Sequence, residues 1–132
     1  MIGHGDWHPE NLCWQGSRLI AVHDWDSVIC QPEPAIAGLA AVSFLGIGGP
    51  GPLADVADSA AFVDAYQDAR GRRWTAADHA ASWAAGLWQR ALDARTQSLS
   101  GDPGQILTRA EAQARLRLAG LDPGLAADVH QP

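Results

Sequence analysis

Short apolar stretches near the start of the chain give way to longer apolar runs after residue 31. The stretches Leu12–Trp14 and Leu19–Val22 are rich in strand-forming residues, and a turn-forming Gln15-Gly16-Ser17 separates them. This spacing predicts a β-hairpin. Residues 4–11 hold a glycine and a proline among polar side chains, which predicts a loop. The hairpin should bring this loop close to the residues that follow it, 23–26.

Four helices are expected after the hairpin. The Ala-rich run 35–45 has the length and composition of a buried helix. Apolar residues recur at helical spacing over 53–71, and the runs 75–99 and 108–120 extend the pattern. Polar N-terminal caps are expected from Thr75 with Asp78 and from Thr108 with Glu111. The sequence therefore predicts an α+β, mainly helical chain. Residues 1–30 should form the loop and hairpin, and 31–132 a helical part of the same domain.

Composition narrows the possible functions. The chain of 132 residues is 47% hydrophobic and 18% charged, which is typical of one globular domain. Its net charge of -6 argues against binding the phosphate backbone of nucleic acids. No apolar run has the length of a membrane span, and the start of the chain lacks the pattern of a secretory signal. Cys13 and Cys30 are interpreted as reduced thiols of a cytoplasmic protein.

Carboxylate and amide side chains cluster in the first 26 residues. Asp6 and Asn11 are five residues apart, and Asp24 and Asp26 follow the predicted hairpin. Phosphoryl transfer from a nucleoside triphosphate needs a carboxylate that receives the proton of the accepting hydroxyl, and oxygen ligands for Mg²⁺. Protein kinases place Asp and Asn at this spacing in the catalytic loop and a metal-binding Asp further along the chain. The pattern favours a phosphotransferase.

The segment His4-Gly5-Asp6-Trp7-His8-Pro9-Glu10-Asn11, followed by Asp24-Trp25-Asp26, resembles the aminoglycoside phosphotransferase family, which includes choline-kinase-like and homoserine-kinase-like enzymes. The family has a protein-kinase-like fold, and the resemblance lies in its C-terminal lobe. It implies Mg²⁺-dependent transfer of the γ-phosphoryl group of ATP or GTP to a hydroxyl of a small molecule, such as an aminoglycoside or a related metabolite.

The same resemblance implies a role for each residue of the motif. Asp6 would be the catalytic base, Asn11 and Asp24 would bind Mg²⁺, and Asp26 would be an auxiliary metal ligand. His4 and His8 would support the loop. In this family an N-terminal lobe that carries a phosphate-binding Lys precedes the catalytic loop, and this chain contains no Lys. We therefore expect a chain without that lobe, whose exposed face the missing lobe or a second copy would cover.

Other interpretations remain open. The chain could be an inactive fragment or pseudokinase that acts as a binding module. The histidines and aspartates at 4, 6, 8, 23, 24 and 26 could instead form the transition-metal site of a hydrolase. Residues 46–51 match a dinucleotide-binding glycine pattern, but helical sequence follows where a second strand is needed. Trp83 and Trp88 are interpreted as packing residues, with a wall of the acceptor pocket as the alternative.

Overall fold

The structure is a computed structural model, and it describes residues 1–45, 53–101 and 107–122. Four helices dominate it, so the prediction of an α+β, mainly helical chain is confirmed. They are α1 (Glu33–Ser43), α2 (Val56–Arg70), α3 (Ala76–Ser100) and α4 (Arg109–Leu118). The glycine-rich segment 46–51 and the residues after 122 lie outside the described residues.

The strands form two small antiparallel sheets. The predicted hairpin is present as β2 (Leu12–Gln15) and β3 (Arg18–Val22), with Gly16 at a positive φ of 61° in its turn. A second pair, β1 (Ile2–His4) with β4 (Val28–Cys30), was not predicted. Two short 3-10 helices, η1 (Pro9–Asn11) and η2 (Trp25–Ser27), lie beside the hairpin.

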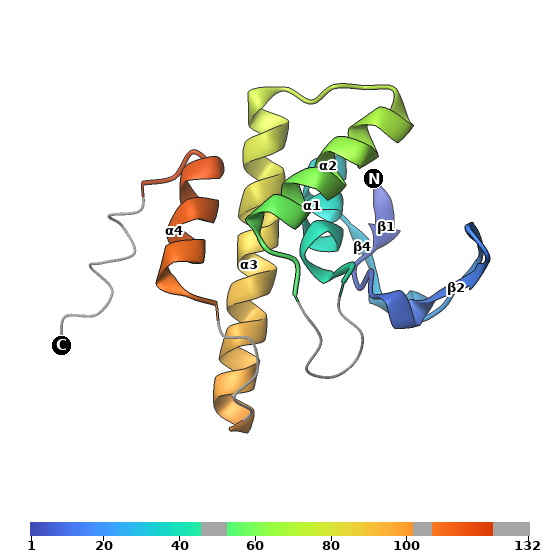
Figure 1. The fold of residues 1–132 in the computed structure, drawn as a ribbon, viewed down its shortest axis with the longest axis horizontal. Coiled ribbons are helices and arrows are strands. Elements are labelled where there is room, and N and C mark those ends of the chain that lie inside the picture. The colour runs from blue at the N-terminus through green and yellow to red at the C-terminus, as the bar shows by residue number, and fades with distance from the viewer. Residues whose placement is uncertain (46–52, 102–106, 123–132) are drawn as a thin grey trace.

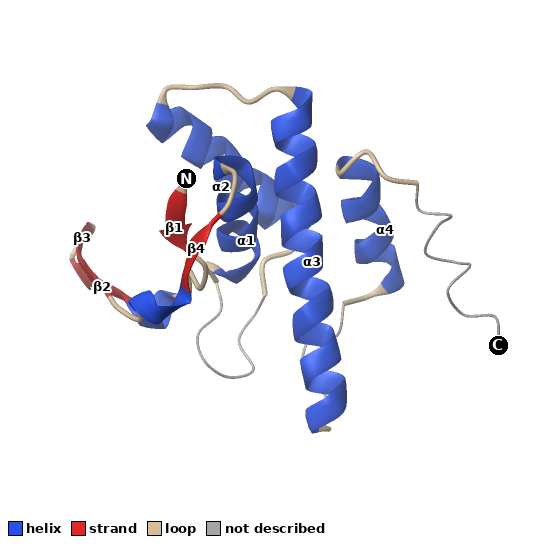
Figure 2. Cartoon of the chain, turned by 180° about the vertical axis from the view of Figure 1, so that it is seen from behind, coloured by secondary structure: helices blue, strands red, loops and turns tan. Residues whose placement is uncertain are grey.

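The helices pack side by side, with the sheets at one end of the molecule. In Figure 1 α3 lies between α4 and α1, and the strands lie beyond α1. Figure 2 shows the same order from behind, with the N-terminus next to β1 and α2. The core consists of Ala37, Ala41, Val63 and Trp74, with Phe62 and Tyr66 packed against it. None of the described helices is long and apolar enough to cross a membrane.

The helix boundaries follow from local capping. Asp55 and Thr75 are the N-cap residues of α2 and α3. The side chain of each accepts a hydrogen bond from the backbone amide three residues later, and the side chain of that later residue accepts one from the backbone amide of the cap. Gly71 ends α2 at a φ of 62°. At the start of α4, the side chain of Thr108 accepts a hydrogen bond from the amide of Glu111, as expected for a cap. The Glu111 carboxylate does not bond back to the Thr108 amide, because it bonds to Arg90 and Arg115. Two buried guanidinium groups outcompete one exposed backbone amide for that carboxylate.

The closest helix contact is made where α1 crosses α3. A Cβ atom added to Gly38 would overlap the backbone of Ser82, and one added to Gly86 would come within 3.0 Å of the carbonyl oxygen of Gly38. Both glycines are buried. The absence of side chains at these two positions therefore sets the distance between the two helices.

Gly38→Ala is expected to destabilise the fold, although Ala is the better helix former. The added methyl group forces α1 and α3 apart, at a cost of about 2–3 kcal/mol in the free energy of unfolding. Gly71→Ala is the matched control, because open space surrounds Gly71 and only its left-handed backbone costs about 1 kcal/mol. Urea denaturation measures both, and a smaller loss for Gly38→Ala than for Gly71→Ala would contradict the close contact.

Candidate functional site

The loop after β1 folds tightly around the carboxylate of Asp6. The amide of His8 donates to the Asp6 carbonyl oxygen at 3.0 Å, and the amide of Asn11 donates to the His8 carbonyl oxygen at 3.0 Å. These turns direct two side chains back to the carboxylate. His8 Nε2 lies 3.0 Å from Asp6 Oδ1, and Asn11 Nδ2 donates to Asp6 Oδ2 at 3.2 Å. Both carboxylate oxygens of Asp6 are therefore held, and Asp6 and Asn11 are in direct contact.

His4 connects this loop to the end of the hairpin. Its Nδ1 accepts from the amide of Asp6 at 3.2 Å, so its Nε2 carries the hydrogen and donates to the His23 carbonyl oxygen at 2.8 Å. The ring is 5% exposed, and its edge packs against the indole of Trp25, with ring centroids 5.2 Å apart. The amide of His23 also donates to the Asn11 carbonyl oxygen at 2.8 Å. Two segments that are distant in sequence are thus joined by backbone and imidazole bonds.

Asp24 and Asp26 follow at the junction of β3 and η2. Asp24 has φ 63° and ψ 47°, and it is the sole non-glycine residue with a positive φ in the part of the chain that the structure describes. Aspartate tolerates this conformation better than most residues. The side-chain hydrogen bond and the negative charge of Asp26 raise the pKa of the Asp24 carboxyl, and slight desolvation and the charge of Asp6 add to the rise. Asp6 and Asp26 therefore both lie within electrostatic range of Asp24.

Asn11, Asp24 and Asp26 carry oxygen atoms of the kind that Mg²⁺ takes as ligands. Asn11 uses its Nδ2 on Asp6, and its Oδ1 has no partner among the described residues. Asp24 and Asp26 repel one another, and a cation between them would relieve that repulsion. No three His, Cys, Asp or Glu side chains of the described residues meet as a metal-binding group. Mg²⁺ commonly takes only one or two protein carboxylates, and waters and substrate phosphates fill its other positions, so it does not require such a group of three.

His4, His8 and His23 form contacts that hold the loop and the end of the hairpin in place. Each ring nitrogen of His4 has a hydrogen-bond partner, which leaves no lone pair for a metal. His8 contacts Asp6, and His23 Nε2 lies 3.2 Å from the Sγ atom of Cys13. Each of the three histidines thus has a protein partner within hydrogen-bonding distance. This arrangement disfavours the transition-metal alternative, in which His4 would be a ligand.

A pocket of about 300 Å³ opens next to the loop. Its wall is formed by β1, the loop, η2, α1 and α2. Trp7 and Trp25 line it, and each is a sequence neighbour of a carboxylate of the site. Phe62 and Tyr66 of α2 pack against the core and also form part of the wall of this pocket.

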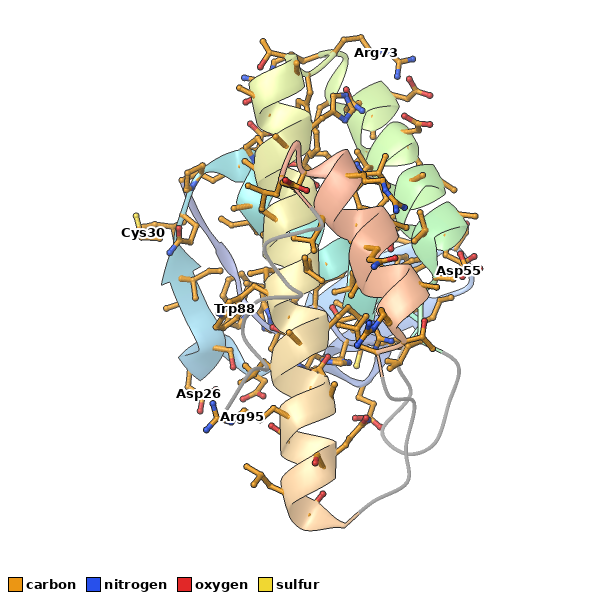
Figure 3. All side chains as sticks on the ribbon, turned by 90° about the vertical axis from the view of Figure 1, so that its left-hand side faces the viewer. Asp26, Cys30, Asp55, Arg73, Trp88 and Arg95 are labelled. Carbon is orange, nitrogen blue, oxygen red and sulfur yellow. The ribbon has the colours of Figure 1, made fainter. Side chains whose placement is uncertain are left out.

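Trp83 and Trp88, which were interpreted as packing residues with the acceptor pocket as the alternative, lie away from this pocket. Trp83 is half-buried beside Arg115, whose guanidinium carbon is 5.8 Å from the indole centroid. Trp88 is 61% exposed, so it is not a core residue. It borders a groove with Ile29 and Leu39, and Figure 3 shows it on the same side of the molecule as Asp26 and Cys30. Neither tryptophan lines the pocket beside the loop.

Sequence reasoning missed a buried ionic cluster far from this loop. Arg90 and Arg115 have side chains that are 4% and 0% exposed, and both bond to Glu111. Arg115 also donates to Ser59 Oγ and to the Ala54 carbonyl oxygen, which joins α4 to the start of α2. Arg115 lies four residues after Glu111 on α4, so the i,i+4 spacing was a usable signal. Arg90 lies on another helix, and no local pattern indicates it.

Comparisons with protein-family models, with curated proteins and with solved structures find no match to this chain.

Asp24→Asn is expected to raise the melting temperature at neutral pH by a few degrees. The amide is isosteric and also tolerates the left-handed backbone, but it removes the like-charge repulsion from Asp26. Differential scanning fluorimetry measures the change. The group is exposed, so high salt should shrink the difference. A lower melting temperature for the variant would show that Asp24 is not under repulsion.

Proposed function

We propose that this chain transfers the γ-phosphoryl group of ATP or GTP to a hydroxyl of a small molecule, with Mg²⁺, as the C-terminal lobe of a protein-kinase-like fold. One observation carries the proposal. His23 bonds to Asn11 and to His4 through its backbone, and this brings the segment with Asp6 and Asn11 beside the segment with Asp24 and Asp26. The residue types, their order along the chain and their proximity all match what phosphoryl transfer requires.

Asp6 acts as the base in this proposal. Its carboxylate orients the acceptor hydroxyl and takes the hydroxyl proton as the oxygen attacks the γ-phosphorus atom. His8 and Asn11 each hold one oxygen of that carboxylate, so Asp6 needs little reorganisation. Asn11, Asp24 and Asp26 would hold the magnesium ion, which supplies positive charge to the phosphates when bound. Since positioning provides most of the rate enhancement in this chemistry, the hydrogen bonds of the loop are functional parts of the site.

In this proposal the acceptor hydroxyl lies beside the Asp6 carboxylate. It has to reach Asp6 in the space that the His8 and Asn11 side chains leave free. Trp83 is separated from this position because it packs against Arg115 and lines cavities with Ser59 and Glu111. We therefore do not include Trp83 in the acceptor site.

Two measurements test the proposal. The first is binding: Mg²⁺ should raise the melting temperature of the wild-type chain and leave Asp24→Asn unchanged, because the variant loses a ligand. The second is turnover: the chain is incubated with Mg²⁺, ATP or GTP and a panel of hydroxyl-bearing small molecules, and ³¹P NMR detects a new phosphate ester. Asp64→Asn is the control, since Asp64 is exposed on α2.

Each outcome is informative. Magnesium stabilisation with ester formation supports the kinase proposal. Magnesium stabilisation that persists in Asp24→Asn removes Asp24 from the metal site. No magnesium effect and no ester with any acceptor would overturn the proposal and favour the non-catalytic binding module instead.

A further inference from the structure

We propose that the pocket between β1, the loop, η2, α1 and α2 is a binding site for an uncharged, apolar small molecule. This site is separate from the carboxylates, because Asp6, Asp24 and Asp26 are absent from its lining. The proposal does not depend on phosphoryl transfer. The lining residues that carry the argument are His4, Trp7, Trp25, Ile36, Phe62 and Tyr66.

The size of the pocket identifies the kind of occupant. Its volume of about 300 Å³ is at the lower end of the range of small-molecule sites. A stable contact with a second protein copy needs at least about 1,000 Å² of well-packed surface, which a pocket of this size does not provide by itself. Aromatic side chains from three separate elements surround it, as they do in sites that enclose a ring or a short aliphatic chain.

The polar side-chain atoms of His4, Trp25 and Tyr66 in the wall already have hydrogen-bond partners. Both nitrogens of His4 are bonded, Trp25 Nε1 donates to the Val22 carbonyl oxygen at 2.9 Å, and the hydroxyl of Tyr66 donates to Glu33 at 2.9 Å. A polar ligand would lose its hydrogen bonds to water and regain none from these groups. An apolar ligand gives up no such bonds and gains the burial of its surface.

The charged side chains near the pocket disfavour an anionic ligand. No Arg side chain lines the pocket. The hydroxyl of Tyr66 donates to the carboxylate of Glu33, and Arg70 pairs with the same carboxylate at 2.9 Å. The sequence neighbours of Trp7 are Asp6 and His8, and those of Trp25 are Asp24 and Asp26. Acidic side chains therefore outnumber basic ones among these neighbours of the pocket.

The test uses two dyes that differ by one charge. Uncharged 1-anilinonaphthalene and its sulfonated, anionic form are titrated into the full chain, and dye fluorescence is followed together with tryptophan quenching. We expect saturable binding of one uncharged dye per chain, and binding of the sulfonate weaker by about tenfold or more, because its charge would have to be buried without a partner. Equal affinity for the two dyes would overturn the proposal.

Matched variants locate the site. Ala40→Leu adds a side chain inside the pocket and is expected to weaken binding of the uncharged dye by about tenfold. Ala85→Leu makes the same change in the groove beside Trp88 and should leave the affinity within about twofold. If circular dichroism shows that Ala40→Leu does not fold, Ile36→Phe fills the same pocket from a half-buried position. Loss of binding in Ala85→Leu alone would assign the dye to the other groove.

Two further results count against the proposal. Binding of one dye per two chains, with a dimer in analytical ultracentrifugation that Ala40→Leu dissociates, would show that a second copy occupies the pocket. Dye binding that rises with dye concentration without saturating, and that is the same in both leucine variants, would show adsorption on exposed apolar side chains such as Ile2 and Trp14.

Discussion

Asp6→Asn is expected to lower the rate of phosphoryl transfer by about a thousandfold, since a general base contributes about 10²–10⁴ to a reaction rate. The amide has nearly the shape of the carboxylate and can still be held by His8, which lies 3.0 Å from Asp6 Oδ1. It cannot take the proton of the acceptor hydroxyl at neutral pH. The measurement is the initial rate at saturating Mg²⁺ and nucleotide, with the acceptor that gives the phosphate ester.

A matched set of variants separates the base from the metal ligands. Asp6→Asn should retain the stabilisation by Mg²⁺, because Asp6 is assigned as the base, whereas Asp24→Asn should lose it. Asp64→Asn on the exposed face of α2 should have the wild-type rate. An Asp6→Asn variant that folds, binds Mg²⁺ and turns over at the wild-type rate would remove Asp6 from the catalytic role.

Local sequence signals identified most of the helices and the hairpin. The Thr75 cap with Asp78 and the glycine at 71 act within a few residues, and both are where the pattern predicted them. The pairing of β1 with β4 escaped prediction for a physical reason. Each strand has three residues, too few to show alternation, and the partners are joined in space only after the whole loop and hairpin have folded between them.

In the candidate site, too, the sequence revealed contacts between residues close along the chain and missed contacts between distant ones. The motif with Asp6 and Asn11 was visible because both residues lie in one loop, and their side chains are in direct contact. The role of His4 in bonding to the His23 carbonyl oxygen could not be read from the sequence, because 19 residues separate them. The left-handed backbone of Asp24 was also not indicated. The apolar pocket was missed because it needs side chains from β1, α1 and α2 together.

Glu111→Gln is expected to be the most destabilising of the charge-altering variants, with a loss of about 3–5 kcal/mol in the free energy of unfolding at neutral pH. Glu111 is the carboxylate that pairs with Arg90 and Arg115 among the described residues. Both guanidinium groups are almost completely buried, and one further nitrogen of Arg90 has no hydrogen-bond partner. Neutralising Glu111 therefore leaves two buried positive charges close together.

Arg70→Gln is the comparison, because it breaks an ion pair of the same type at the surface. Arg70 is 55% exposed in its pair with Glu33, and pairs of this kind contribute about 1 kcal/mol or less. Guanidinium chloride is unsuitable because it screens charge, so urea denaturation at fixed ionic strength should rank the two variants. A loss for Glu111→Gln no larger than that for Arg70→Gln would show that the buried cluster has access to solvent.

The pH dependence gives a second and independent check on the same cluster. Burial raises the pKa of Glu111, but the hydrogen bonds and charges of Arg90 and Arg115 outweigh it and hold the pKa below the ordinary value of 4.5. A carboxyl whose pKa is lowered on folding stabilises the protein above its unfolded-state pKa, and that stabilisation is lost as the pH falls through the folded-state pKa. The difference between wild type and Glu111→Gln should therefore be full at neutral pH and shrink in acid. A difference that stays constant below the folded-state pKa would show that packing, and not the charge of Glu111, joins α3 to α4.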